Sequence, residues 1–352
     1  MDRNETRGHE SRFSTRALEP AGRFEAWRRS IGVLFDVEQP ATATPFDSEI
    51  HAFLLNHMML ALCRSGAQRF VRSNLRLGQD GLDYYCAQLF LEGGQQHRRG
   101  GTVLQCRAGD IAIYDFADQH YAETEPFANL SLIVPRATLS PLLRSPDSIN
   151  GLLISADAPL AAVLTQHMMS LFKSAPELSD QESALLLEPT CSLVAAVING
   201  HDDDLVDVPT AVSRSQAFRA RDFIHRNLEE ADLTPERIAQ AIGVSRAALY
   251  RLFSNEGGVQ AWIRRQRVFE AARRLTDPKH REVPIGEIAW SLGFRSETVF
   301  SRNFREEFGV TPSAARGSGI SARRALDLHE PGPVGDHRYE YWLEEVLRGE
   351  RA

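Results

Sequence analysis

The chain has 352 residues, of which 43% are hydrophobic and 25% charged, so it can form at least two globular domains and is not disordered throughout. No apolar run approaches the length that spans a bilayer, which argues against a membrane protein. The formal net charge of −7 argues at first against a nucleic-acid binder.

The first twenty residues, MDRNETRGHESRFSTRALEP, carry charges throughout and lack the apolar stretch of a secretory signal. Residues 1–20 are therefore expected to form a disordered arm, and the protein is expected to stay in the cytoplasm. The cysteines show neither C-x-x-C spacing nor neighbouring histidine pairs. No metal or other cofactor is predicted, and buried free thiols are expected at Cys63, Cys86, Cys106 and Cys191.

Residues 46–134 contain short apolar or alternating runs that are typical of strands, such as HAFLLNHMMLALC, LDYYCAQLFL and DIAIYDF. The stretches RSGAQ, LGQDG, EGGQQHRRGG and RAGD supply turn residues between the runs. Their regular spacing predicts an all-β sandwich or barrel.

From residue 158 to residue 199 the apolar residues follow a helical period and form two stripes, separated by KSAPELSD with Ser179 as a candidate N-cap. The two helices either complete the core of the first domain or form the seam of a homodimer. The first stripe is Leu160, Val163, Leu164, His167, Met168, Leu171 and Phe172, and the second is Leu185, Leu186, Pro189, Leu193, Val194, Val197 and Ile198.

The acidic stretch HDDDLVDVPT has the composition of a solvated linker. It places a first domain at 21–200, a linker at 201–213, a second domain at 214–316 and a loose tail at 317–352. Tyr339, Trp342, Leu343 and Val346 are spaced for one short helix in that tail, whose role the sequence does not assign. From Ser213 to Arg316 there are 18 basic against 13 acidic residues, so the second domain is positive although the chain is negative.

The second domain contains an internal repeat, in which ERIAQAIGVSRAALYRLF is echoed by GEIAWSLGFRSETVFSRNF. The first halves match at an offset of 50 residues and the second halves at 51, so the insertion falls in a turn. A repeat of this size means that one supersecondary unit was built twice. The matched pairs are Ile238 with Ile288, Ala239 with Ala289, Ile242 with Leu292, Gly243 with Gly293, Leu249 with Phe300, and Phe253 with Phe304.

Each copy has the residue types of a helix-turn-helix. Small residues, Ala239 and Ala289, allow two helices to cross closely. Glycine after the first helix permits a left-handed turn, and serine then caps the second helix. The turn glycines are Gly243 and Gly293, the caps are Ser245 and Ser296, and Thr234 caps the first helix of the first copy.

The residues left on the outer face of each second helix are candidates for contact with DNA, because arginine bridges guanine atoms and small hydroxyls and methyls meet base edges. For a single copy they could equally be solvated surface. They are Arg246, Ala247, Tyr250 and Arg251 in the first copy and Glu297, Thr298, Ser301 and Arg302 in the second.

The segment VQAWIRRQRVFEAARRLTD between the copies is expected to form a linking helix that fixes their separation, near one turn of DNA, about 34 Å. A single chain would then read an asymmetric site. Its arginines, Arg264, Arg265, Arg273 and Arg274, either contact phosphates or are solvated.

The run IGEIAWSLGFRSETVFSRNFREEFGVTPSAAR resembles the DNA-binding domain of the AraC/XylS family of bacterial transcription regulators. The first copy departs from the family pattern in having Ala261 where Pro312 stands in the second. The resemblance implies a promoter or operator in double-stranded DNA as partner, usually activation, and RNA polymerase as a possible further partner.

RAGDIAIYDFADQH, with Gly109, Asp110 and His120, is similar to the second cupin motif, so the first domain resembles the cupin-like effector-binding domain of the same family. That implies a small-molecule effector, whose site no residue identifies. The His-x-His pair of the first cupin motif is missing, with only His97 nearby. His97 and His120 are expected to be hydrogen-bonded barrel residues and not metal ligands.

The predicted fold is therefore α+β, a cupin-like β-barrel with two helices followed by an all-α double helix-turn-helix domain. The predicted function is transcription regulation and not catalysis. Two alternatives stay open: a constitutive DNA binder whose first domain only dimerises, and a cupin-type oxygenase or isomerase fused to a DNA-binding module.

Overall fold

The computed structural model describes residues 9–39, 46–74, 76–77, 82–99, 102–201, 211–230, 232–254, 257–319 and 334–343. The chain divides into two units. The first, called the β domain here, contains the described residues up to 72, those from 82 to 201, and the segment 334–343. The second, the helical domain, contains the described residues between 211 and 319 together with residues 73–74 and 76–77.

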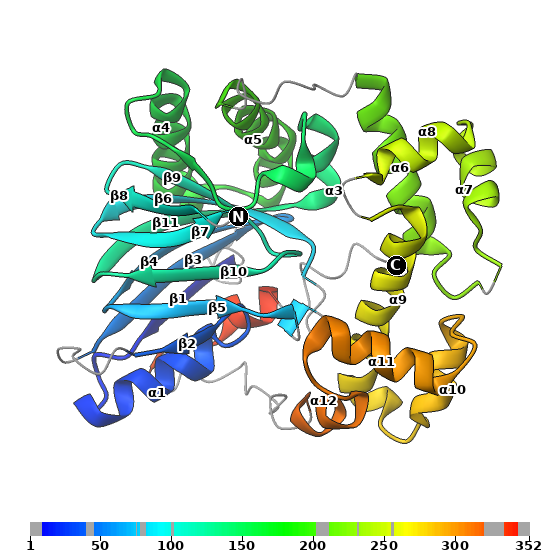
Figure 1. Ribbon diagram of the computed structural model, residues 1–352. Coiled ribbons are helices and arrows are strands. Elements are labelled where there is room, and N and C mark those ends of the chain that lie inside the picture. Colours follow the sequence, from blue (N-terminus) through cyan, green and yellow to red (C-terminus); the bar gives the residue numbers. More distant parts are fainter. Residues whose placement is uncertain are drawn as a thin grey trace. The chain divides into compact units, whose positions relative to one another are not determined.

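The β domain contains two antiparallel sheets (Figure 1). One has seven strands in the order β1-β3-β4-β11-β6-β9-β12, and the other has five in the order β2-β5-β10-β7-β8. The strands of the first sheet are β1 (Glu10–Ser14), β3 (Ser48–Leu55), β4 (Met58–Ser65), β11 (Phe127–Pro135), β6 (Tyr84–Glu92), β9 (Ile111–Asp115) and β12 (Leu152–Ile154). Those of the second are β2 (Asp36–Glu38), β5 (Gln68–Arg72), β10 (His120–Thr124), β7 (Gly94–Arg99) and β8 (Thr102–Arg107).

The strands of the larger sheet are apolar on both faces because both faces are buried. On β3, Ile50, Ala52 and Leu54 face the core between the sheets, whereas Phe53 and Leu55 face the helices on the other side. This accounts for the nearly continuous apolar run HAFLLNHMMLALC. The hairpin between β3 and β4 turns at Asn56, whose φ of 57° is tolerated by asparagine.

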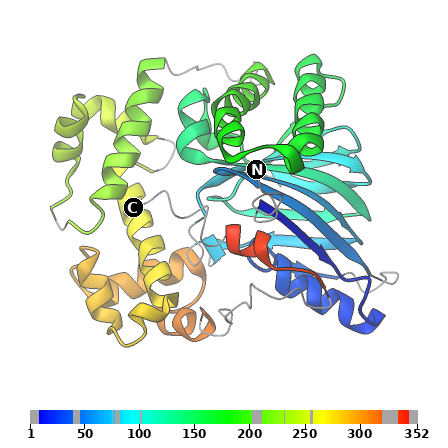
Figure 2. The ribbon, with the colours of Figure 1, turned by 180° about the vertical axis from the view of Figure 1, so that it is seen from behind.

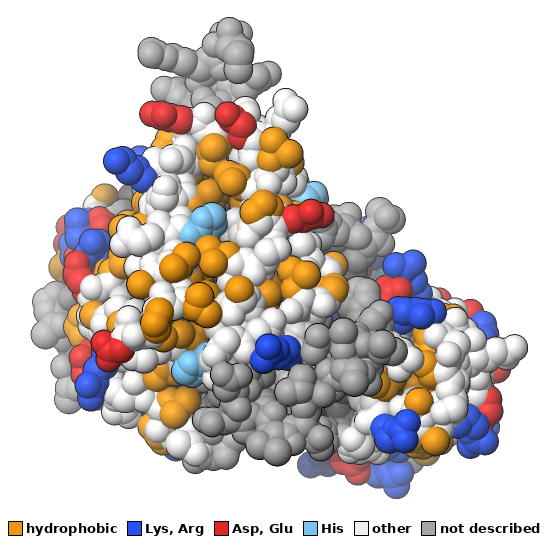
Figure 3. Space-filling view, turned by 90° about the horizontal axis from the view of Figure 1, so that it is seen from above, with side chains coloured by type: hydrophobic (Ala, Val, Ile, Leu, Met, Phe, Trp, Pro, Cys, Tyr) orange, Lys and Arg blue, Asp and Glu red, His pale blue; other side chains and the backbone are white. Residues whose placement is uncertain are grey.

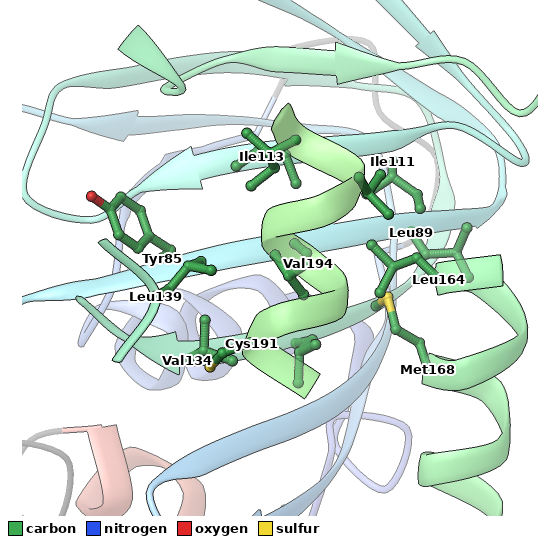
Figure 4. Packing of buried hydrophobic residues seen from close by; sticks show 14 of the residues in the cluster. Tyr85, Leu89, Ile111, Ile113, Val134, Leu139, Leu164, Met168, Cys191 and Val194 are labelled. Atoms are coloured by element: carbon green, nitrogen blue, oxygen red, sulfur yellow. The ribbon is translucent and has the colours of Figure 1, made fainter. Parts of the chain in front are cut away.

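Helices α4 (Pro159–Ser174) and α5 (Asp180–His201) cover the outer face of the larger sheet. Figure 4 shows Leu164 and Met168 of α4 and Val194 of α5 packed against Leu89 and its neighbours on the strands. Ser179 and Glu182 form a capping box, with the Ser179 hydroxyl 2.6 Å from the Glu182 carboxylate. The predicted cap and the core role of the two helices are therefore confirmed.

Four residues of the predicted apolar stripes are exposed, however. They are Leu160, Val163, Leu185 and Pro189, with Leu185 70% exposed, and Ala161 takes the buried place on α4. The helices present apolar side chains outward as well as inward, as the view onto them in Figure 3 shows. Helix α5 is also long and apolar enough by composition to cross a membrane, which the sequence analysis did not anticipate. The face of α5 that carries Val194 and Ile198 packs into the core of the β domain.

The remaining elements of the β domain are short, apart from α1. They are α1 (Pro20–Ile31), α3 (Arg136–Leu139), α13 (Arg338–Tyr341) and the 3₁₀ turns Ser140–Leu142, Pro146–Ser148 and Ala175–Glu177. Helix α1 packs with its buried Trp27 and Ile31 against the core between the sheets.

Three predictions about the β domain are wrong. The expected disordered arm contains β1, which pairs with β3 in the register Phe13 to Ile50; residues 1–8 lie outside the described part. EGGQQHRRGG is not only a turn, because Gly94–Arg99 forms β7. The expected loose tail is ordered in part: the short helix expected there is present as α13, and Tyr339, Trp342 and Leu343 are buried in the core between the sheets, beside α1 in Figure 2.

The helical domain is built on two cores that share one long helix, α9 (Val259–Thr276). The first core joins α6 (Ala211–Arg226), α7 (Pro235–Ile242) and α8 (Arg246–Leu252) to the start of α9. The second joins the end of α9 to α10 (Ile285–Ser291), α11 (Glu297–Phe308) and α12 (Pro312–Gly319). A 3₁₀ turn, Pro278–His280, follows α9. The predicted α+β class with a double helix-turn-helix is thus confirmed.

The structure moves the predicted boundaries by a few residues. Residues 211–213, placed in the linker, begin α6, and 317–319, placed in the tail, end α12. His201, also placed in the linker, ends α5. Residues 202–210 lie outside the described part of the chain.

Candidate functional site

The first helix-turn-helix unit consists of α7 and α8. The Thr234 hydroxyl accepts the amide of Arg237 and so caps α7, and the Ser245 hydroxyl accepts the amide of Ala248 at 3.2 Å and caps α8. Between the helices Gly243 has a φ of 72°, a left-handed conformation that ends α7. These local signals fix the turn.

The second unit, α10 and α11, repeats this geometry. Ser296 caps α11 by accepting the amides of Thr298 and Val299, and Gly293 has a φ of 73°. The amide of the residue after each turn glycine bonds to the crossing alanine, Val244 to Ala239 at 2.9 Å and Phe294 to Ala289 at 3.0 Å. Both alanines are buried as predicted. The two copies therefore have the same fold.

Seven of the eight candidate DNA-contact residues are exposed on α8 or α11, and Ser301 is half-buried. Between them, the inward positions Leu249, Phe300 and Phe304 are completely buried. Each second helix thus presents a polar face outward while the opposite face anchors it. This is the arrangement that a recognition helix needs.

The linking helix α9 has 18 residues and spans about 27 Å at 1.5 Å per residue. Arg267 lies near its middle and donates to the carbonyl oxygens of Leu228 and Glu230, at 3.0 and 2.6 Å. The same guanidinium lies beside Gly293 of the second unit, and burial lowers the pKa of Arg267. Arg267 therefore links the turn after α6 to the turn of the second unit.

A second candidate site is a cavity of about 70 Å³ between the two sheets, partly open to solvent. With the space that is open to solvent included, the hollow measures about 740 Å³. Among the residues that the structure describes, no Asp, Glu, Lys or Arg side chain lines it. Its apolar wall includes Trp27, Ile31, Phe35, Phe70, Phe90, Phe116, Phe127, Tyr339 and Leu343.

Polar groups lie on two walls of this cavity. On the larger sheet, the Gln88 amide donates to the Ser131 hydroxyl at 3.1 Å, and Asn129 lies next to Ser131. Near the smaller sheet are Gln95, Tyr114, His120 and Thr124, with the Gln95 amide bonded to the Tyr114 hydroxyl. The cavity thus offers neutral hydrogen-bonding groups within an apolar surface.

The two histidines named from the cupin resemblance lie near this cavity. His97 is buried and its Nε2 lies 2.9 Å from the carbonyl oxygen of Gly151, as expected for a hydrogen-bonded barrel residue. His120 lines the cavity beside the Tyr114 ring, with ring centres 4.3 Å apart. Burial, together with His97 and Arg72, lowers the pKa of His120 to about 3, so it is neutral at pH 7. Over the described residues, no group of three His, Cys, Asp or Glu is placed to hold a metal.

The other two residues of the cupin-like run have a structural role. Gly109 turns with a φ of 92°, and the Asp110 carboxylate accepts the amides of Arg107 and Ala156. The predicted thiols are free, three buried and Cys63 half-buried.

Comparisons with known proteins decide the family. The AraC-binding-like domain matches residues 24–199, and a helix-turn-helix domain matches residues 238–318. The chain belongs to the AraC/XylS family of bacterial transcription regulators. It is 25% identical over 317 residues to the transcriptional activator NphR of a Rhodococcus species, covering 86% of this chain and 91% of NphR. It is 33% identical over 238 residues to the virulence regulon activator VirF of Yersinia enterocolitica, covering 65% of this chain and 79% of VirF.

Among solved structures, the AraC-like transcriptional activator CuxR is similar over 74% of this chain and 95% of its own, with a TM-score of 0.52 and 26% identity. This AraC/XylS-family regulator therefore combines a DNA-binding helix-turn-helix domain with a domain of the effector-binding type.

In this AraC/XylS-family protein two candidate contact residues have partners of their own. Arg246 pairs with Glu236 of α7 at 2.8 Å, and the Glu297 carboxylate lies beside Gly286 at the start of α10. Each is the first residue of its second helix and contacts the first turn of the preceding helix. The side chains of Arg246 and Glu297 are therefore both directed toward the preceding helix of their own unit.

Arginines of the linking helix α9 also have partners within the helical domain. Arg274 bonds to Glu229, Glu270 and Ser291, Arg273 bonds to Glu270, and Arg265 bonds to Glu307. Of the four, Arg264 and Arg265 are exposed, whereas Arg273 and Arg274 are half-buried.

The sequence reading missed the cavity of this regulator and two exposed apolar residues of its second unit. Trp290 on α10 is 62% exposed and Val299 on α11 is 41% exposed. Val299 adjoins Thr298, so the 3.6-residue period could have placed it on the outer face. No local signal marks the cavity, because its lining comes from α1, several strands and the C-terminal segment.

Proposed function

We propose that this chain activates transcription in the cytoplasm from promoters that it reads with α8 and α11, in response to a neutral small molecule bound between the two sheets. What carries the proposal is the pair of exposed, serine-capped second helices on one linking helix. Two probes of different surface fit an asymmetric site in adjacent major grooves. RNA polymerase is the further partner that activation requires.

The proposed base contacts are Arg251 and Arg302, which lie on the outer faces of their helices. Genome-wide mapping of bound DNA would supply the cognate site. On that site we expect Arg251→Ala and Arg302→Ala each to cost about 1–3 kcal/mol and to weaken discrimination at one base pair. The charge-matched control is Arg28→Ala, an exposed arginine of α1. Equal losses on cognate and random DNA would make that arginine a phosphate contact.

The proposed effector is mainly apolar with one or two hydrogen-bonding groups. A charged ligand would lose its hydration without meeting an opposite charge among the described lining residues, which is costly. Neutral aromatic compounds should therefore raise the melting temperature, and their carboxylate analogues should not. Ala61→Phe, which places a larger side chain in the cavity wall, should abolish the shift. A shift that survives Ala61→Phe would place the effector elsewhere.

We further propose that the exposed face of α4 and α5 forms the seam of a homodimer. Val163 of α4 and Leu185 of α5 are more than half exposed, and Leu160 and Met169 of α4 are exposed as well. The double variant Val163→Glu with Leu185→Glu should sediment as a monomer. Val103→Glu, at an exposed position on β8, is the control that should leave the dimer intact. A wild-type monomer at micromolar concentration would contradict the proposal.

A further inference from the structure

The described C-terminal segment, Val334–Leu343, pairs with the edge of the larger sheet. Gly335 forms an antiparallel bridge with Phe13 of β1. The Ser14 amide donates to the Val334 carbonyl oxygen at 2.7 Å, and the Asp336 amide donates to the Arg12 carbonyl oxygen at 3.0 Å. Because β1 is the outer strand of its sheet, the segment covers an edge that would otherwise be open.

Only glycine permits this approach at position 335. Its φ is 104°, and a Cβ atom there would lie 2.1 Å from the Arg12 carbonyl oxygen. That atom belongs to the backbone of a paired strand and has little freedom to move. Gly335 is therefore a single position at which docking of the segment can be blocked.

Buried polar groups make the docking specific. The Tyr339 and Ser30 hydroxyls lie 2.6 Å apart, and the Ser30 hydroxyl also bonds to the Glu340 carboxylate, which is only 2% exposed. Nδ1 of His337 lies 3.0 Å from both oxygens of Glu340. A carboxylate is stable at such burial only when its oxygens are hydrogen-bonded. The segment is thus fitted to this one place on α1 and β1.

The same segment forms part of the cavity wall. Tyr339 and Leu343 line the cavity together with Trp27 and Ile31 of α1. Figure 2 shows the segment, in red, beside α1 at this side of the sheets. Without it, the cavity would lose two apolar lining groups and open further to solvent.

We propose that the C-terminal segment is a structural wall of the effector site and that effector binding and docking of the segment favour each other. The inference rests on the proposed role of the cavity. A ligand that touches Tyr339 and Leu343 binds more tightly to the docked state, so by linkage it stabilises docking. In the sequence, residues 320–333 join the segment to α12, so docking anchors the chain that follows the DNA-binding domain to the β domain. Ligand binding thereby bears on the DNA-binding domain.

The test compares Gly335→Ala with Gly22→Ala in the full chain. At Gly22 an added Cβ would meet nothing within 4 Å, so this variant is the matched control. Hydrogen exchange of the Ser14 and Asp336 amides reports docking directly. The ligand probe is N-phenyl-1-naphthylamine, a neutral dye whose fluorescence rises in apolar surroundings.

In the wild type and in Gly22→Ala we expect both amides to be protected, and more so with the dye. In Gly335→Ala the protection should be lost and the Kd of the dye should rise about fivefold or more, because apolar contacts with Tyr339 and Leu343 are lost. Leu343→Ala should weaken binding of the dye while leaving the Ser14 amide protected from exchange. This variant therefore separates loss of a cavity-lining side chain from loss of folding.

Loss of protection in Gly335→Ala with an unchanged Kd would overturn the inference while the cavity keeps its proposed role, provided that Ala61→Phe abolishes dye binding. Dye binding that survives Ala61→Phe would remove the cavity as ligand site and overturn both proposals. Exchange of the Ser14 and Asp336 amides at unprotected rates in the wild type would also overturn the inference.

Discussion

The two helix-turn-helix units share one scaffold and differ on their surfaces. Both have a serine cap, a left-handed glycine and a buried alanine at the helix crossing. The equivalent first residues of the second helices carry opposite charges, Arg246 and Glu297, and only the second unit exposes a tryptophan, Trp290. The duplicated interior preserves the fold, while the divergent exterior is what the proposed reading of two different half-sites requires.

The largest expected effect concerns the interior of the second unit. Phe300 is fully buried and its ring centre lies 5.1 Å from that of Phe294 and 5.5 Å from that of Phe304. Phe300→Ala should cost about 3–5 kcal/mol, because it removes buried surface and leaves a void. Native-state hydrogen exchange of the α11 amides measures this loss. The neighbouring Val299→Ala is the control, and an equal loss in both variants would contradict the assigned burial.

The turn glycines come next and should not be equivalent. A Cβ atom added at Gly243 would meet no atom within 4 Å. Gly243→Ala should therefore lower the free energy of unfolding by about 1–2 kcal/mol, from the left-handed conformation alone. Gly293→Ala would place its Cβ 2.7 Å from the Arg267 guanidinium, which is held by two backbone carbonyl oxygens. Because the guanidinium must also be displaced, Gly293→Ala should lower the free energy of unfolding by about 2–4 kcal/mol in total.

Chemical denaturation of both variants measures the difference. Combining Gly293→Ala with Arg267→Ala should recover part of the loss from the clash. Equal costs at the two glycines would show that Arg267 does not link the turns.

The serine caps should give smaller and more similar effects. Ser296→Ala and Ser245→Ala should each cost about 1 kcal/mol, with Ser296→Ala the larger because its hydroxyl accepts two amides instead of one. Aspartate at either position, which also caps helices, should restore stability. A cap variant that loses nothing in denaturation would show that its turn is fixed by packing alone.

These caps and glycines also explain how far the sequence could lead. Ser245, Gly243 and their copies act within a few residues of themselves, so the repeat revealed the helices, the turns and the exposed faces directly. The cavity has no such local signature, because Gln88, Trp27 and Tyr339 meet only after the sheets have formed. Strand β1 was missed for the same reason, since its pairing partner β3 lies more than thirty residues away. The exposure of Leu185 was missed because an all-round apolar helix does not show which face is buried.

The smallest effect tests the surface difference itself. Arg246 and Glu236 are both more than half exposed, so Arg246→Ala should cost less than about 1 kcal/mol of stability. An exposed arginine can exchange its carboxylate for a DNA phosphate, so we expect the variant to reduce the salt dependence of DNA binding by roughly one counterion. Glu297→Ala should leave that salt dependence unchanged, because a carboxylate releases no counterion from DNA. Identical slopes for the two variants in a salt titration would mean that the two helices meet DNA in the same way, and the proposed division between shared scaffold and divergent surface would fail.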